Sequence, residues 1–289
     1  MRKKIEKISL FRKVFSIFWK NVKGGLDIFK KKWYTITMKV YEYKENFKLK
    51  YCDVDFKDEC KVSTALALME EVACQSADEL GFGYSYTKSL NHAFMVSNIC
   101  LQFEKPIRLG EVVTLKTWPL QPTKVIFGRE YLIELEDETL ARGSSRWCLI
   151  DMQTGKIAPS KRISNQDYST YNTNRVFEEV QWKIPTFLPE EGELCFTIKI
   201  ANSEYDHNMH VNNTRYADYC INCFSIAELS RVFLKSFSIS YIKQAKEGDV
   251  LCFYRKKTED GRYAVQGMKD GKELIVQAWI GFEENHAKK

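Results

Sequence analysis

The sequence of 289 residues has no long hydrophobic run. A membrane-spanning helix needs about 18 consecutive apolar residues, and no uncharged apolar stretch approaches that length. The longest apolar stretch near the start, residues 14–19, is interrupted by Ser16 and flanked by Lys13 and Lys20. It is shorter than the apolar core of about 7–15 residues in a secretory signal. We therefore predict a cytoplasmic protein without a transmembrane segment.

Several chemical signatures are also missing. The nine cysteines are odd in number and scattered through apolar patterns, which indicates reduced, buried thiols and not a disulfide framework. Cys220 and Cys223 form a single CxxC with no second pair, so a zinc site is not expected. His92 and His286 stand alone, and the sequence contains neither a phosphate-binding glycine motif nor a Gly-x-Ser-x-Gly elbow. No metal or cofactor is predicted.

Excess positive charge is confined to the start of the chain. Residues 1–37 carry eleven Lys or Arg against two acidic residues, whereas the remaining 252 residues carry 33 basic and 36 acidic side chains. The body of the protein therefore lacks the charge signature of a nucleic-acid-binding domain.

Residues 1–37 have the pattern of a basic amphipathic helix, in which apolar residues recur every three or four positions from Ile8 to Val22. Such a helix can lie on an anionic membrane surface or meet an acidic partner. The alternative is a poorly ordered extension, with Met38 as the biological start. Both interpretations stay open.

The sequence after residue 37 contains an internal repeat. The stretch KPIRLGEVVTL (105–115) aligns with KQAKEGDVLCF (243–253) at an offset of 138 residues, and residues 55–62 align with 206–213 at an offset of 151. Internal similarity at so long a period indicates two copies of one fold unit. We place the first unit at 38–162, a linker at 163–193 and the second unit at 194–283.

Each unit is predicted to contain one long helix and several strands. The buried stripe of the first helix runs from Val62 through Leu66 and Met69 to Leu80. The second helix starts after Asn212 or Asn213 and runs toward Val232, burying Tyr216, Tyr219, Cys220, Cys223, Ile226 and Ala227. Alternating patterns predict strands over 93–103, 125–135, 194–200, 237–241, 263–267 and 274–282. A helix followed by antiparallel strands, twice over, predicts an α+β fold.

The densest polar constellation lies just before the second helix. Asp206, Asn208 and His210 alternate, so in an extended segment they project to the same side. A carboxylate, a carboxamide and an imidazole beside the positive end of a helix dipole can orient water, move protons and stabilise an oxyanion. The alternative is that these residues merely turn and cap the chain. The first unit has Asp55, Lys57 and Glu59 at the matching places, and this asymmetry favours a functional role in the second unit.

The sequence DHNMHVNNTRY (206–216) is similar to the motif DxNxHVNNxxY of the acyl-acyl carrier protein (ACP) thioesterase family. GREY (128–131), SSRW (144–147) followed by Ile150 and Asp151, and SYIKQ (240–244) before Gly248 and Asp249 extend the resemblance over about 38–282. The resemblance implies two tandem hotdog folds, each a long helix wrapped by an antiparallel sheet. It also implies hydrolysis of fatty acyl-ACP.

The resemblance also implies roles for individual residues. Catalysis is assigned to Asp206, Asn208 and His210, with Gln244 and Ala245 standing where relatives have a glutamate and, in plants, a cysteine. A glutamine can orient water but cannot accept its proton, so Asp206 or His210 becomes the base or nucleophile. Residues assigned to substrate binding are Asn212, Asn213 and Tyr216. A basic surface for the acidic ACP is assigned to Arg215, Lys243 and Lys246, with Lys235 and the run 255–257 as further candidates.

Two other functions stay open. One is an acyl-CoA thioesterase, and the other is a non-catalytic acyl-thioester-binding hotdog protein, which the change to Gln244 makes credible. The oligomeric state, monomer or homodimer, and the preferred acyl chain are not predicted.

Overall fold

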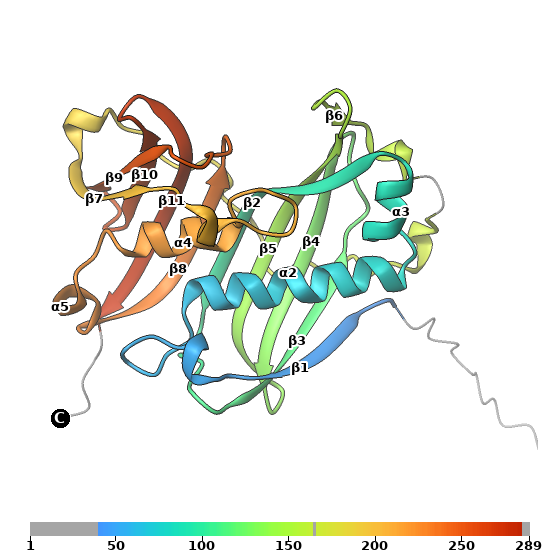
Figure 1. Ribbon diagram of the computed structural model, residues 1–289. Helices are drawn as coiled ribbons and strands as arrows, with labels where there is room; N and C mark the ends of the chain where they lie inside the picture. Colours follow the sequence, from blue (N-terminus) through green and yellow to red (C-terminus); the bar gives the residue numbers. More distant parts are fainter. Residues whose placement is uncertain (1–39, 164–165, 285–289) are drawn as a thin grey trace, which may run out of the picture. The chain divides into compact units, whose positions relative to one another are not determined.

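In the computed structural model, which describes residues 40–163 and 166–284, eleven strands join one antiparallel sheet (Figure 1). The strands are β1 (Tyr43–Lys48), β2 (His92–Phe103), β3 (Val112–Pro119), β4 (Ile126–Leu135), β5 (Glu138–Asp151), β6 (Ile157–Ala158), β7 (Glu193–Lys199), β8 (Val232–Tyr241), β9 (Val250–Lys257), β10 (Tyr263–Lys269) and β11 (Glu273–Glu284). The α-helices are α2 (Val62–Glu79), α3 (Tyr84–Ser89), α4 (Asn213–Ile221) and α5 (Ile226–Leu229). Short 3-10 turns lie at Tyr51–Asp53, Ser160–Arg162, Tyr168–Thr170, Pro189–Glu191 and Asn202–Glu204.

The sheet consists of two halves with the same internal order. The first half reads β1-β3-β4-β5-β2 and the second, from the opposite edge, β7-β9-β10-β11-β8, so β2 and β8 meet in the middle. These two strands pair over Asn98↔Ser240 to Gln102↔Ser236. Helices α2 and α4 lie on the same side of the sheet, and one hydrophobic core runs through both halves (Figure 1). The predicted α+β double-hotdog architecture is confirmed.

Equivalent backbone hydrogen bonds confirm the internal repeat. The N–H of Gly110 donates to the carbonyl of Leu49 at 3.0 Å, and the N–H of Gly248 donates to the carbonyl of Ile200 at 2.9 Å. Both glycines have a positive φ, +84° and +88°, which residues with a Cβ rarely adopt. The glycine shared by the two aligned stretches is therefore required by the same turn in each half.

The first helix and its strand follow the predicted pattern, with one exception. Val62, Leu66 and Met69 are each at most 4% exposed along α2. Met95 lies four residues before Ile99 in the predicted strand 93–103, so regular alternation would place both on one buried face, but Met95 is 37% exposed. A β-bulge between Val96 and Asn98 reverses the inward and outward alternation along β2, so this prediction was wrong.

The second helix is shorter than predicted. Helix α4 ends at Ile221, and the chain turns before a new helix, α5, begins. A capping box defines this second start, because the Ser225 side chain accepts the N–H of Glu228 and the Glu228 carboxylate accepts the N–H of Ser225. Ile226 and Ala227 are consequently exposed, contrary to the prediction.

Some predictions concern residues outside the described part of the chain. The amphipathic helix at 1–37, its membrane contact and His286 all lie there. Within 40–163 and 166–284, no helix has the length and apolar character needed to span a membrane. The nine cysteines are free thiols, but Cys52 and Cys74 are exposed where burial was predicted, and four others are half-buried.

Candidate active site

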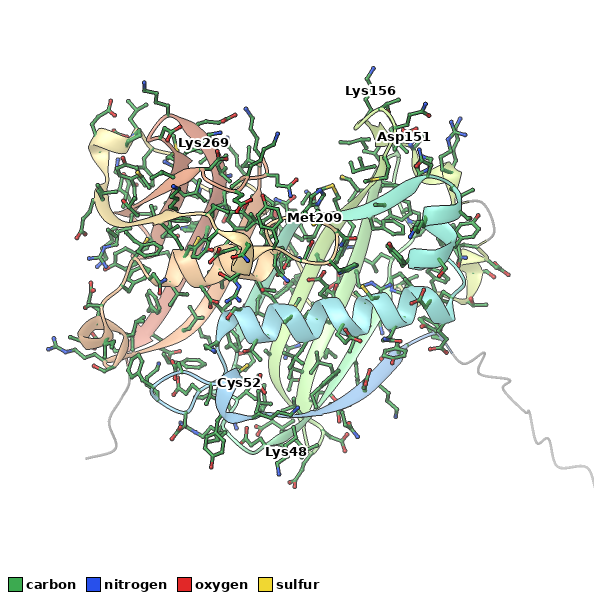
Figure 2. All side chains as sticks on the ribbon, viewed as in Figure 1. Lys48, Cys52, Asp151, Lys156, Met209 and Lys269 are labelled. Carbon is green, nitrogen blue, oxygen red and sulfur yellow. The ribbon has the colours of Figure 1, made fainter. Side chains whose placement is uncertain are left out.

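The polar segment before α4 is a tight turn and not an extended strand. Tyr205 and Val211 form an isolated antiparallel bridge, and between them the N–H of Asp206 donates to the carbonyl of His210 at 2.8 Å. The Asp206 Oδ1 atom accepts the N–H groups of Asn208 at 2.8 Å and His210 at 3.1 Å. Met209, labelled in Figure 2, has a φ of +60°. The Asp206 side chain stabilises the turn by accepting hydrogen bonds from the backbone of the segment. The prediction that Asp206, Asn208 and His210 lie in an extended segment was therefore wrong.

The first half of the protein contains the same turn. Asp55 Oδ1 accepts the N–H groups of Lys57 at 2.8 Å and Glu59 at 3.2 Å, while Asp58 has a φ of +59°. The two aspartates therefore have one structural role in common. What distinguishes the second turn chemically is the side chains of Asn208 and His210.

The side chains of Asn208 and His210 are unengaged. Neither makes a hydrogen bond to another residue of the described ranges, whereas at the matching places Lys57 and Glu59 form an ion pair at 2.9 Å. Asn208 is exposed and His210 is half-buried. The Asp206 Oδ2 atom is likewise not used by the turn. A carboxylate oxygen, an amide and an imidazole thus remain open to a ligand from one turn.

Asn212 caps helix α4, as predicted. Its Oδ1 atom accepts the N–H of Thr214 at 2.9 Å and the Thr214 hydroxyl at 2.7 Å. The N–H of Arg215 donates to the Asn212 carbonyl at 3.0 Å, so the Asn213 N–H is the first-turn donor left without a partner in the described residues. This end of the helix carries the positive end of the dipole. The turn of Asp206 and the N-terminus of α4 are therefore contiguous in the chain.

Asn213 links this helix end to the other half of the protein. Its Nδ2 atom donates to Glu70 Oε2 of α2 at 2.9 Å, and its Oδ1 atom is buried without a hydrogen-bond partner in the described chain. The Tyr241 hydroxyl of β8 donates to the Asn213 carbonyl at 3.2 Å. Asn213 is thereby held from both sides.

Glu70 is the site residue that sequence analysis missed. Burial raises the pKa of Glu70, and the hydrogen bond from Asn213 partly offsets this; the charge of Asp206 raises the pKa further and His207 lowers it. The signal was present, since Glu70 lies four residues after Leu66 and three before Ala73, on the edge of the buried stripe. A carboxylate at such a position needs a polar partner, but the sequence does not say which.

Gln244 is exposed, whereas Tyr216 is buried and hydrogen-bonded. The Tyr216 hydroxyl accepts the N–H of Ala245 at 3.1 Å, and the Tyr205 hydroxyl accepts the N–H of Glu247 at 2.6 Å. Burial raises the pKa of Tyr216 to about 12. These two tyrosines hold the loop after β8 against the turn and α4, while the Gln244 side chain is exposed.

The basic residues proposed for docking divide into two groups. Several are engaged in ion pairs: Lys243 with Glu273, Lys235 with Glu104, Arg255 with Glu193 and Glu228, and Lys256 with Glu191. Arg215 and Lys246 have no ion-pair partner within the described residues, and both are exposed. Their neighbours Tyr216 and Ala245 are hydrogen-bonded, so these two free cations come from segments in contact.

Comparison with known families gives two matches. The acyl-ACP thioesterase N-terminal domain matches residues 40–166, and the acyl-ACP thioesterase C-terminal domain matches residues 191–283. The palmitoyl-acyl carrier protein thioesterase of Arabidopsis thaliana is 22% identical over 257 residues, covering 78% of this chain and 62% of the relative. Oleoyl-acyl carrier protein thioesterase 2 of the same plant is 20% identical over 242 residues, covering 73% and 62%. The chain thus spans about 62% of the length of these curated relatives.

Solved structures share the fold. An acyl-ACP thioesterase from Bacteroides thetaiotaomicron has a TM-score of 0.76 at 20% identity, covering 84% of this chain and 98% of that one. A 12:0-ACP thioesterase from Umbellularia californica has a TM-score of 0.76 at 15% identity, with the same coverage.

Proposed function

Because the chain belongs to the acyl-ACP thioesterase family, we propose that it hydrolyses the thioester bond between a fatty acyl group and ACP. The products would be a free fatty acid and the ACP thiol, which would end chain elongation in cytoplasmic fatty acid biosynthesis. One observation carries this proposal: of two equivalent turns, the second alone presents an unengaged amide and imidazole beside a capped helix N-terminus.

The geometry supports a division of labour among these groups. The thioester carbonyl oxygen would accept from the Asn213 N–H at the start of α4, where the helix dipole stabilises developing negative charge. Asp206 would use its free Oδ2 atom to activate water, or to attack the carbonyl carbon directly and form an anhydride that water then hydrolyses to the free acid and the Asp206 carboxylate. Asn208 would orient the reacting groups. As the C–S bond breaks, His210 would supply a proton to the departing thiolate.

Glu70 and Gln244 would act around this core. Glu70 fixes Asn213, and through it the first turn of the helix that receives the carbonyl oxygen. Gln244 would hold water as donor and acceptor. Neither a metal nor a cofactor has a step in this scheme.

The test is incubation of the full chain with acyl-ACPs of graded chain length, with the released thiol trapped and the free acids identified. A matched series of acyl-CoA substrates is run in parallel. Faster turnover of the ACP series supports the proposal, whereas faster turnover of the CoA series favours an acyl-CoA thioesterase.

A non-catalytic acyl-binding role is the second candidate. It is favoured by the exposed Gln244, which cannot act as a base, and by the use of Asp206 Oδ1 in turn formation. In that case, acyl-ACP would bind without release of thiol, and hydrolysis would be refuted.

A further inference from the structure

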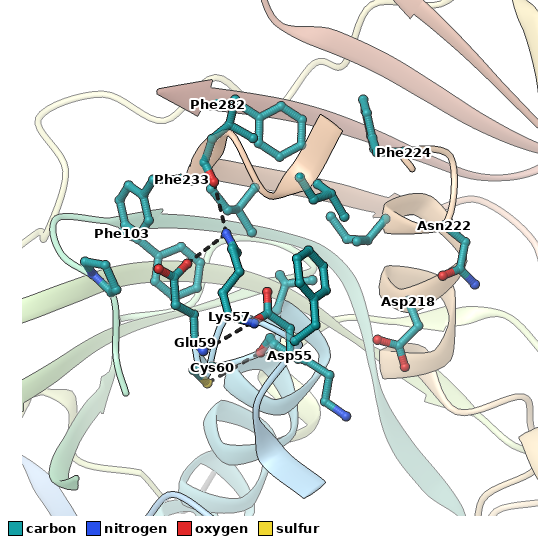
Figure 3. Close-up of a pocket in the computed structure, with 18 of the residues that line it drawn as sticks. Asp55, Lys57, Glu59, Cys60, Phe103, Asp218, Asn222, Phe224, Phe233 and Phe282 are labelled. Carbon is teal, nitrogen blue, oxygen red and sulfur yellow. Dashed lines mark hydrogen bonds and ion pairs between the residues drawn. The ribbon is translucent and has the colours of Figure 1, made fainter. Parts of the chain in front are cut away.

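A pocket lies at a junction of the two halves, and Asp206, Asn208 and His210 do not line it. Its volume is about 530 Å³, within the range of roughly 300–1,000 Å³ usual for small-ligand sites. The turn at 55–61 and the start of α2 form one wall, and α4, α5 and the start of β8 form the other (Figure 3). Rings of Phe103, Phe224, Phe233 and Phe282 face the space between them.

The internal repeat relates this pocket to the candidate active site. At the offset of 151 residues, Val62 is equivalent to Asn213 and Ile221 is equivalent to Glu70. At the offset of 138 residues, Pro106 is equivalent to Gln244. The three apolar residues of these pairs, Val62, Ile221 and Pro106, all line the pocket. The pocket therefore occupies an equivalent position but has apolar groups where the active site has polar ones, which suits a hydrocarbon chain and not hydrolysis.

The charged groups inside the pocket are largely neutralised internally. Lys57 pairs with Glu59 at 2.9 Å and donates to the carbonyl of Val232 at 3.0 Å. Asp55 uses Oδ1 in its turn, and its Oδ2 makes no hydrogen bond to another described residue. Glu59 also lies 3.7 Å from Arg108. The charges of Lys57 and Glu59 are therefore satisfied within the pocket.

Two cations at the rim are free of ion pairs. Lys61 and Arg215 line the pocket and have no ion-pair partner among the described residues. Three acids of the lining, Asp55, Glu204 and Asp218, have no ion-pair partner there either, and the Glu204 carboxylate accepts the N–H of Ala201 and the hydroxyl of Ser203. Lys61 is also the N-cap residue of α2, and no side chain caps that helix. Uncapped first-turn N–H groups attract carboxylates. A cation, a helix N-terminus and an apolar cavity thus meet at one site.

We propose that this pocket binds a long-chain free fatty acid, with the hydrocarbon chain among the phenylalanine rings and the carboxylate toward Lys61 and the N-terminus of α2. Binding here needs no hydrolysis, so the proposal can fail or succeed independently of the thioesterase activity. If both hold, the product of the reaction has a second site on the enzyme.

The test uses palmitate and a photoreactive palmitate analogue with the full chain. Cross-linked peptides are mapped by mass spectrometry, and dissociation constants are measured for wild type, Phe233→Asp, and Leu188→Asp. Leu188 is 60% exposed and does not line the pocket, so Leu188→Asp controls for an added carboxylate. Thermal unfolding of each variant confirms that it is folded.

We expect wild type to be cross-linked in residues 55–62 and 232–234. In Phe233→Asp these cross-links should be lost and the dissociation constant for palmitate should rise at least tenfold, because the variant places an unpaired charge against the hydrocarbon chain. Leu188→Asp should bind as wild type. Cross-links confined to 205–216, or unchanged binding by a folded Phe233→Asp, would refute the site.

The headgroup is tested separately, with a variant that leaves the apolar lining intact. Lys61→Gln should weaken palmitate binding about tenfold through loss of a charged hydrogen bond while leaving methyl palmitate unaffected. Equal binding of palmitate by wild type and Lys61→Gln would overturn the assignment of the carboxylate.

Discussion

Asp55 and Asp206 make the same pair of hydrogen bonds in two turns that lie 151 residues apart. Each accepts through Oδ1 the N–H groups two and four residues later. The turn therefore belongs to the duplicated scaffold, and the proposed chemistry depends on what the second copy adds to it: Asn208, His210 and the adjoining contact between Asn213 and Glu70.

The first prediction uses this equivalence as a control. Asp206→Asn retains an Oδ1 acceptor for the turn but loses the carboxylate, so we expect kcat to fall at least a hundredfold, within the roughly 10²–10⁴ range of acid–base groups. Asp55→Asn makes the same change in the first turn and should keep near wild-type kcat. Steady-state hydrolysis of acyl-ACP measures both. Similar losses in the two variants would mean that the turn, and not the Asp206 carboxylate, supports activity.

The second prediction separates the charge of Glu70 from its hydrogen bond. Glu70→Gln still offers an oxygen to Asn213, whereas Glu70→Leu leaves a buried amide without a partner. If Glu70 positions Asn213, Glu70→Gln should retain most of kcat and Glu70→Leu should lose at least tenfold, with KM for acyl-ACP little changed. Equal, severe losses in both variants would instead assign the charge itself a direct role.

The third prediction concerns stability and pH. Burial raises the pKa of Glu70 in the folded protein above its ordinary value of 4.5. Between the unfolded and the folded pKa, the native state therefore binds more protons than the unfolded state. Stability contributed by protonated Glu70 is therefore present below the unfolded pKa and lost as the pH rises through the folded pKa. Urea unfolding at several pH values should show wild type losing stability relative to Glu70→Gln as the pH rises from 4.5. A pH-independent difference would contradict this.

The fourth prediction compares two buried tyrosines of α4. Tyr216→Phe removes the acceptor of the buried Ala245 N–H, and an unsatisfied buried donor costs about 1–3 kcal/mol. Tyr219 has a buried hydroxyl without a partner in the described chain, so Tyr219→Phe should leave the free energy of unfolding unchanged or raise it. Chemical denaturation of both variants provides the measurement, and a larger loss for Tyr219→Phe would disprove the argument.

The fifth prediction concerns ACP docking. Arg215→Glu and Lys246→Glu reverse cations that are free of ion pairs, so each should raise KM for acyl-ACP several-fold, with a larger effect at low salt. Acyl-pantetheine, which lacks the acidic protein, should be hydrolysed as by wild type. Lys48→Glu, an exposed reversal on β1, serves as the control. Equal KM values for all four proteins at low salt would exclude docking at this surface.

Much of the fold could be predicted from the sequence because its signals are local or repeated. The buried stripe of α2 and the cap at Asn212 each depend on residues a few positions apart. Two of the failures share one cause: the bulge after Val96 and the capping box at Ser225 change the periodicity within an element, and a pattern extended across them assigns Met95 and Ile226 to the wrong environment.

Residue order was enough to show that two related units follow one another and that the second carries the histidine motif. The folded chain was needed to see that Asp206 folds its own turn, that Glu70 contacts Asn213, and that Lys243 is paired with Glu273 while Arg215 has no ion-pair partner among the described residues. These contacts join residues that the pairing of β2 with β8 and the loop geometry bring together. Hydrogen bonds and ion pairs depend on atoms within a few ångströms, a separation that residue order alone does not encode.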